Sequence, residues 1–137
     1  MDIPTRITAS FDRQAMMKTF GATLVSVEKG RVVLRAPILS GSTQQQGFAH
    51  AALTFGLGDS AAGYSALTLM PEESEVVTAE IKINLTAPAT GDWIEARGRV
   101  IKPGRRLVVV SADVFSIRGD QETLVAVLMG TMVPVPT

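Results

Sequence analysis

The chain contains no cysteine and only one histidine, and its 13 basic side chains balance 13 acidic ones. Without cysteine there is no disulfide, no thiolate nucleophile and no cysteine-ligated zinc site. Balanced charge argues against a nucleic-acid partner, because such proteins need a positive field to attract phosphates. Since His50 is the lone histidine and the acidic residues are dispersed, we expect no metal site.

The length of 137 residues fits one domain with one core, and a hydrophobic content of 46% is ordinary for a globular protein. We therefore expect a single domain over residues 1–137. Residues 1–6 lack a basic start followed by an apolar segment, which argues against a signal peptide. The expectation that follows is a cytoplasmic protein that does not act on membranes.

Hydrophobic periodicity predicts an α+β domain with antiparallel strands and one long helix packed on the sheet. We expect helices and strands at these positions: helices at 5–19 and about 50–70, strands at 22–28, 31–36, 75–87, 92–102, 106–117 and 123–133. The last strand is apolar on both faces, which places it inside the sheet. A membrane span is the alternative for the long helix, but three glycines, an aspartate and a polar start favour a buried central helix.

The segment 75–87 alternates between apolar and polar residues, as a half-buried strand does. The pattern predicts that the odd-numbered positions from Val77 to Leu85 share one face. Thr78, Glu80, Lys82 and Asn84 are then expected on the opposite face.

Asp59 is the one charged residue between Ala36 and Pro71, where the chain's average of 19% would place about seven. A carboxylate in such surroundings is costly to desolvate and needs a partner or a raised pKa. It shares a helix face with Ala52, Gly56 and Gly63. Because mid-helix glycines are unfavourable, this face serves either close packing of a second backbone or access of a ligand to the carboxylate. A structural, capping aspartate is the alternative.

The segment 44–52, Gln-Gln-Gln-Gly-Phe-Ala-His-Ala-Ala, ends where the long helix begins. Free backbone N–H groups at a helix start, aided by the helix dipole, can stabilise an oxyanion. His50 can serve there as a catalytic base, or it can cap the helix and fix the loop by hydrogen bonds; the second reading is favoured.

These features resemble the hotdog-fold thioesterase superfamily, in particular its phenylacetic-acid-pathway (PaaI-like) branch. That pattern has an amide residue, then Gly-x-x-His-Gly-Gly, then an acidic residue nine positions after the histidine. Gln44, Gly47, His50 and Asp59 stand at the matching spacing. Segment 77–84, Pro88, Gly91 and Gly104-Arg105 extend the likeness over roughly residues 18–134. Ala51-Ala52 replaces the two glycines, which keeps the backbone N–H groups but narrows the channel.

The resemblance implies an antiparallel sheet wrapped around one central helix, and hydrolysis of an aryl or medium-chain acyl-coenzyme A with no bound cofactor. Asp59 would be the general base or the nucleophile, and the N–H of Ala51 would polarise the carbonyl. Gln44, Thr78 and His50 complete the catalytic set. The residues expected to contact the substrate are Gly47, Phe48, Ala52, Gly63, Asn84 and, for the carrier phosphates, Arg105 and Arg106 with Lys82 behind them.

Assembly follows from the position of two of these residues on one helix. Ala51 and Asp59 are eight residues apart, about 12 Å along the axis, too far for both to reach one carbonyl. Two antiparallel helices related by a two-fold axis bring the start of one beside the middle of the other, as in the hotdog family. We expect a homodimer with shared sites, paired further into a homotetramer.

Two other functions compete with hydrolysis. One is a hotdog hydratase or dehydratase, although the Pro-Gly that follows the histidine region in carrier-protein dehydratases is missing here. The other is a non-catalytic acyl-thioester-binding protein, which the Ala51-Ala52 replacement favours. A hydrolysis assay against a panel of acyl-coenzyme A substrates discriminates among the three.

Overall fold

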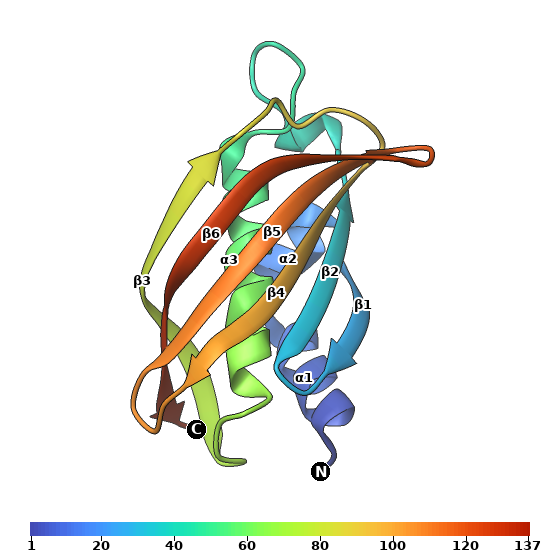
Figure 1. Ribbon diagram of the computed structural model, residues 1–137. Coiled ribbons are helices and arrows are strands. Elements are labelled where there is room, and N and C mark those ends of the chain that lie inside the picture. The colour runs from blue at the N-terminus through green and yellow to red at the C-terminus, as the bar shows by residue number, and fades with distance from the viewer.

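The computed structural model describes all residues from 1 to 137 (Figure 1). Its helices are α1 (Ile3–Arg13), α2 (Ala15–Phe20) and α3 (Ala51–Leu67), with a short 3-10 turn at Ser40–Ser42. Its strands are β1 (Thr23–Glu28), β2 (Arg31–Pro37), β3 (Ser74–Leu85), β4 (Trp93–Pro103), β5 (Val108–Arg118) and β6 (Gln121–Pro136). The predicted elements are therefore present, apart from the first helix, which is two helices.

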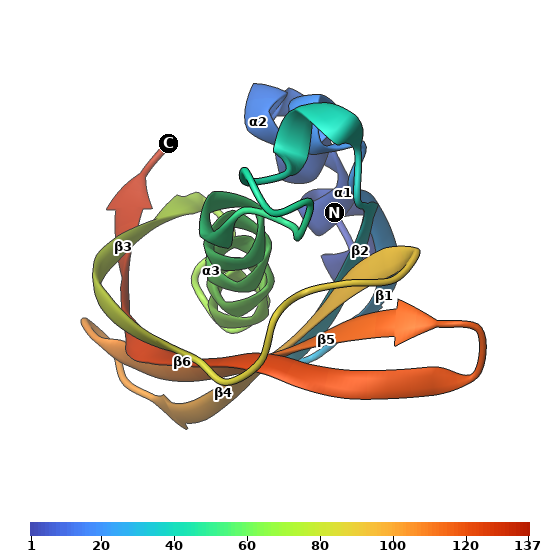
Figure 2. The same cartoon turned by 90° about the horizontal axis from the view of Figure 1, so that it is seen from above.

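All six strands form one antiparallel sheet in the order β1-β2-β4-β5-β6-β3, so β1 and β3 are its edges. Figure 2 shows the sheet curving around α3, with α1 and α2 on the side that the sheet leaves open. The prediction that the last strand lies inside the sheet is confirmed, because β6 pairs with β5 on one side and β3 on the other. The arrangement leaves α3 central and almost wholly buried.

Close packing of α3 on the sheet depends on residues with little or no side chain. Ala61, Ala62 and Ala66 of the helix are 0% exposed and lie in the core. A Cβ atom on Gly98 of β4 would overlap the carbonyl oxygen of Ala61, so the helix backbone rests directly on that strand. None of the helices has the length and apolar character needed to cross a bilayer.

The predicted helix at 5–19 is wrong in one respect, because the chain turns at Gln14 between α1 and α2. Gln14 has φ −85° and ψ 98°, which is extended backbone. The hydrophobic spacing that predicted one helix continues on both sides of this break. The turn aims the Gln14 side chain at α3, where it is held by hydrogen bonds with Ser60 and Tyr64. A long-range contact therefore overrides the local pattern.

The predicted alternation of the strand at 75–87 is also corrected, because β3 contains a β-bulge. The pairing of β3 with β6 shifts register between Thr78 and Glu80. A bulge adds one residue to one strand and so reverses which side chains face inward. Val76 and, beyond the bulge, Ile81 and Ile83 pack against the core, whereas Val77 is 45% exposed. Thr78 thereby points towards α3 rather than away from it.

Candidate active site

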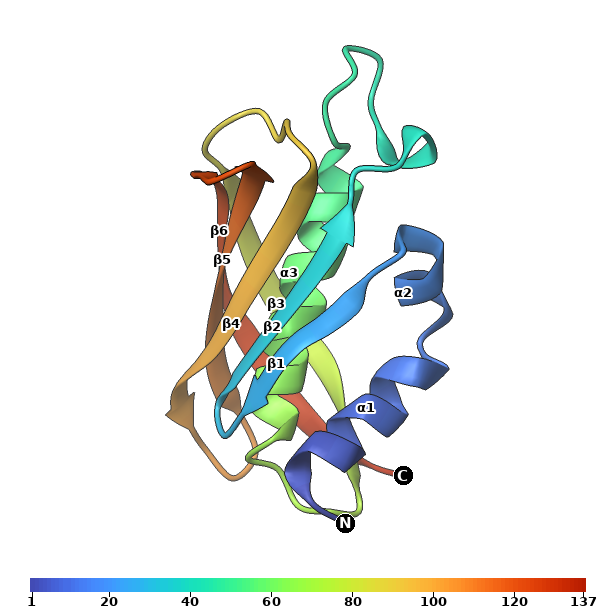
Figure 3. The same ribbon diagram turned by 90° about the vertical axis from the view of Figure 1, so that its right-hand side faces the viewer.

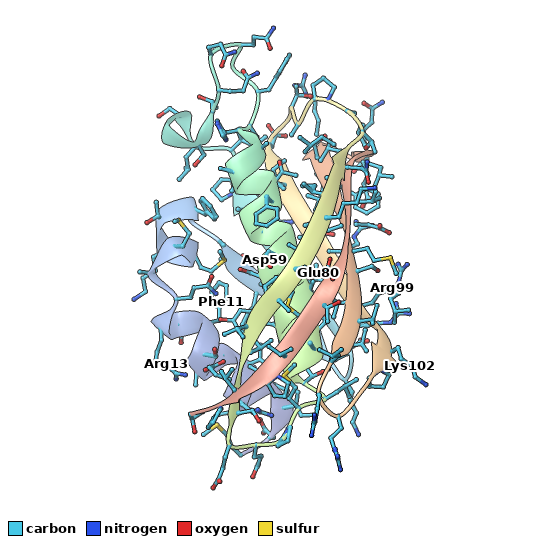
Figure 4. All side chains as sticks on the ribbon, turned by 90° about the vertical axis from the view of Figure 1, so that its left-hand side faces the viewer. Phe11, Arg13, Asp59, Glu80, Arg99 and Lys102 are labelled. Carbon is cyan, nitrogen blue, oxygen red and sulfur yellow. The ribbon has the colours of Figure 1, made fainter.

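Asp59 lies midway along α3, on the side of the helix that faces β3 (Figure 4). Thr78 donates a hydrogen bond of 2.7 Å to its Oδ1 atom. Burial raises the pKa of Asp59 above the ordinary carboxyl value, and the Thr78 hydrogen bond opposes that shift. No other hydrogen bond or ion pair reaches the carboxylate. A partly desolvated carboxylate with a free Oδ2 can act as a base or as a nucleophile.

Asp59 opens onto a hollow of about 320 Å³, which we call the Asp59 groove. Its lining residues include three from the N-terminal segment, two from α3 and two from β3: Ser10, Arg13, Gln14, Asp59, Gly63, Glu75 and Thr78. A Cβ atom on Gly63 would meet nothing closer than 3.8 Å. A methyl group at this position would therefore make ordinary van der Waals contacts, so close packing of a second backbone does not explain Gly63. Gly56 is different, because a Cβ there would lie 2.8 Å from the Phe20 ring.

A chain of hydrogen bonds forms the groove wall on the α1 side. Ser60 donates to the amide oxygen of Gln14 over 3.2 Å, and the Gln14 amide donates to the Tyr64 hydroxyl over 3.0 Å. Ser10 lies 3.4 Å from the Tyr64 hydroxyl and donates to the Glu75 carboxylate. Sequence reasoning missed these residues, because they are far apart in the chain and form no local motif.

The start of α3 carries a free backbone donor. His50 caps the helix, because its Nδ1 atom accepts a hydrogen bond of 2.8 Å from the N–H of Ala52. The N–H of Ala51 has no acceptor in the protein. The favoured reading of His50, as a cap, is therefore what the structure shows. The unpaired Ala51 N–H has the geometry of an oxyanion donor at a helix N-terminus.

The loop before α3 is a small hairpin that projects from the end of the molecule (Figure 3). Thr43 bridges to Ala49, and Gly47 has φ +88°, which favours glycine. The Gln44 side chain turns into this loop, where its Oε1 atom accepts from the N–H groups of Gln46 and Phe48. Gln44 therefore holds the loop that leads to the Ala51 donor.

A second hollow, of about 530 Å³, lies at this end of the molecule, and we call it the helix-start hollow. Its walls are the loop residues Gln44, Phe48, His50 and Ala51 and the turn after β3. It shares no lining residue with the Asp59 groove. Within one chain, the Asp59 carboxylate and the Ala51 N–H therefore lie at different hollows, consistent with their spacing of about 12 Å along α3.

The structure does not gather the remaining predicted residues in either hollow. Arg105 and Arg106 are exposed in the loop between β4 and β5, and Asn84 and Lys82 are exposed on β3. The other two, Gly47 and Ala52, are exposed beside the helix-start hollow. No group of three or more histidine, aspartate or glutamate side chains is close enough to hold a metal ion.

Comparison with known proteins identifies the family and the fold of the chain. A family model described as the thioesterase superfamily matches residues 46–123. A proposed esterase of Saccharolobus solfataricus is 31% identical over 121 residues, covering 88% of this chain and 78% of that protein. The crystal structure of a thioesterase family protein from Silicibacter pomeroyi is 38% identical, with a TM-score of 0.96 over 98% of this chain and 99% of that one.

The E. coli PaaI protein, from the phenylacetic acid degradation operon, has a similar fold at lower sequence identity. It is 19% identical, with a TM-score of 0.86 over 97% of this chain and 93% of that chain. At this identity the likeness shows the fold alone. The six-stranded antiparallel sheet wrapped around a long helix is the hotdog fold, as predicted.

Proposed function

The chain belongs to the thioesterase superfamily and is a thioester hydrolase, and from that premise we propose that it hydrolyses acyl-coenzyme A at Asp59. The observation that carries the proposal is the partly buried carboxylate, held through one oxygen by Thr78 and facing an open groove. As a base, Asp59 takes a proton from water while the water oxygen attacks the acyl carbon. As a nucleophile, the carboxylate attacks that carbon itself and water then cleaves the resulting anhydride.

In either route the carbonyl oxygen becomes negative when the new bond forms. The free N–H of Ala51 at the start of α3 suits that charge, since it is unpaired and lies at the positive end of the helix dipole. Breaking the carbon–sulfur bond then releases coenzyme A. In the base route its sulfur takes up the proton that Asp59 removed from water; in the nucleophile route it leaves as a thiolate, which is protonated by the water that later cleaves the anhydride. The products are a free acid and a thiol, and no cofactor enters the reaction.

The proposal places each active site between two chains. The Asp59 groove and the helix-start hollow share no residue within one chain, and about 12 Å of helix separates Asp59 from Ala51. β3 supports pairing with a second copy, because it is a sheet edge with unpaired backbone groups and exposed Val77 and Leu85. A two-fold axis beside β3 would bring the groove of one chain to the hollow of the other.

The exposed Arg105 and Arg106 are proposed to contact the phosphates of coenzyme A. Neither side chain forms a hydrogen bond or ion pair within the chain, so both guanidinium groups are available. Arginine binds phosphate through paired donors, which suits this task. These contacts would add affinity without touching the reacting atoms.

Replacing Asp59 by asparagine tests the proposed function. We expect kcat to fall at least about 100-fold, as for loss of a base or nucleophile, with the fold retained. The assay measures free-thiol release from a panel of acyl-coenzyme A substrates. Asp113→Asn, which removes a carboxylate on the outer face of β5, is the matched control and should behave as the native protein. Near-normal turnover by Asp59→Asn would refute the assigned role.

A further inference from the structure

Side chains from α1 and β3 bond to one another across the Asp59 groove. Glu75 of β3 accepts hydrogen bonds from Ser10 of α1, with its two carboxylate oxygens 3.1 and 3.2 Å from the hydroxyl. Arg13, also from α1, pairs with the same carboxylate at 2.9 Å. All three side chains line the groove. We call these three residues the crossbar.

The crossbar contacts the hydrogen-bonded groove wall on the α1 side. Tyr64, which is 5% exposed, lies between Ser10 and Gln14, and the Phe11 ring packs against it with the ring centres 6.2 Å apart. Figure 4 shows Phe11 and Arg13 together on the α1 side of Asp59. The polar groups of this wall form hydrogen bonds mainly with one another. An apolar part of a ligand can therefore lie against the wall without leaving buried donors unpaired.

The distance from Asp59 to the crossbar follows from the two elements that span it. Thr78, which holds Asp59, is three residues from Glu75 along β3, or about 10 Å. Tyr64 is five residues beyond Asp59 along α3, or about 7.5 Å. An extended chain advances about 1.2 Å per bond. An acyl group whose carbonyl lies at Asp59 therefore meets the crossbar after about six to eight bonds.

We propose that the crossbar of Ser10, Arg13 and Glu75 ends the acyl groove and restricts the enzyme to acyl groups of about six to eight carbons. This inference rests on the proposed function, since it places the acyl group in the Asp59 groove. The groove volume of about 320 Å³ is adequate, because an apolar cavity of about 150 Å³ already accepts benzene. A longer chain would have to displace a charged pair and a hydrogen bond.

Removing the crossbar tests the proposal through a chain-length series from butyryl- to dodecanoyl-coenzyme A. In the native enzyme, kcat/KM should rise to hexanoyl or octanoyl and fall at decanoyl. In Glu75→Ala the fall should move at least two carbons further, so that the decanoyl-to-hexanoyl ratio rises about 16-fold, at about fourfold for each of two newly buried methylenes. Glu75→Gln keeps the size and accepts from Ser10, so its ratio should stay within about twofold of the native value.

Two further variants separate the crossbar from general effects. Glu73→Ala removes an exposed carboxylate two residues away, outside the groove, and should leave the length profile unchanged. If Glu75→Ala does not fold, the double variant Ser10→Ala/Arg13→Ala releases Glu75 from both partners and should shift the profile in the same direction. An unchanged profile in a folded crossbar variant would overturn the proposal.

A binding experiment distinguishes failure of this proposal from failure of the proposed function. S-hexyl- and S-decyl-coenzyme A lack the carbonyl and cannot be hydrolysed, so their affinity reports the groove alone. The native protein should bind the hexyl compound more tightly, and Glu75→Ala should lose that preference. If Asp59→Asn is inactive but the preference persists in Glu75→Ala, only the crossbar proposal fails. If Asp59→Asn stays active, the proposed function fails.

Discussion

At the scale of single residues, the proposed role of Asp59 requires its carboxyl group to be ionised. Burial raises the pKa of this carboxyl and the Thr78 hydroxyl opposes the shift, since it donates to the ionised form. The ionised form is the active one in either route. Activity should therefore be present above the pKa of Asp59 and fall as the pH drops through it.

Replacing Thr78 by valine should move the acidic side of the pH–activity profile to higher pH. Valine removes the only hydrogen bond to the carboxylate, so the pKa of Asp59 rises further and a higher pH is needed to ionise it. The measurement is kcat/KM against pH, which reports the free enzyme. Thr78→Ser keeps a hydroxyl and should hold the profile near its native position. An unmoved profile in Thr78→Val would show that the hydrogen bond does not tune Asp59.

The residues of the site differ in how far the sequence could predict them. Asp59 was predicted from its isolation among uncharged residues, and Ala51 from its place at a helix start. The structure gives Asp59 a groove and leaves the Ala51 N–H free, while their roles remain predictions. Gln14 and Tyr64 were not predicted, because their meeting depends on how α1 packs on α3. No spacing within the chain signals that contact.

At the scale of elements, the glycines of α3 serve two different purposes. Gly63 borders the Asp59 groove, and a Cβ there would make ordinary contacts at 3.8 Å or more, whereas a Cβ on Gly58 would lie 2.8 Å from the Leu128 side chain. The same substitution should therefore have opposite effects on stability at the two positions.

Gly63→Ala should stabilise the fold by about 0.5–1 kcal/mol, because alanine loses less backbone entropy in a helix. Its methyl group enters the groove floor, so kcat/KM for a medium-chain substrate should fall several-fold. Gly58→Ala should instead destabilise by about 1–3 kcal/mol through overpacking. Thermal unfolding and the thiol-release assay measure both effects. If Gly63→Ala were destabilised and its kinetics were unchanged, Gly63 would not border the substrate groove as we describe.

The elements themselves were largely predictable, and the two exceptions have a common physical cause. The break at Gln14 and the bulge in β3 both leave the local hydrophobic pattern intact. The break directs the Gln14 side chain towards α3, and the bulge changes which side chains of β3 face the core. Both are decided by partners distant in sequence, α3 in one case and β6 in the other. Periodicity within one segment carries no information about either.

At the scale of the whole molecule, the proposed sharing of each active site between two chains makes a quantitative prediction for mixed dimers. Asp59→Asn removes the carboxylate, and Ala51→Pro removes the proposed oxyanion donor. Proline suits this place, because it is the first helical position, the lost N–H has no acceptor, and His50 before it is already extended with ψ 144°. Each variant alone should be inactive.

Co-refolding the two variants in equal amounts should restore about a quarter of native activity. Half of the dimers are then mixed, and in each of these one site carries both lesions and the other neither. Native mass spectrometry confirms that mixed dimers are present. If both residues of a site came from one chain, every site would keep one lesion and no activity would return.

The position of β6 also has a consequence during synthesis of the protein. β3 pairs only with β6, the last strand in chain order, so β3 leaves the ribosome before β4, β5 and its own partner exist. The nascent chain carries an unpaired strand with exposed apolar residues, the kind of segment that chaperones bind. Thr78 is fixed opposite Asp59 only when β6 docks. The proposed catalytic carboxylate therefore gains its Thr78 partner only after β6 has been synthesised.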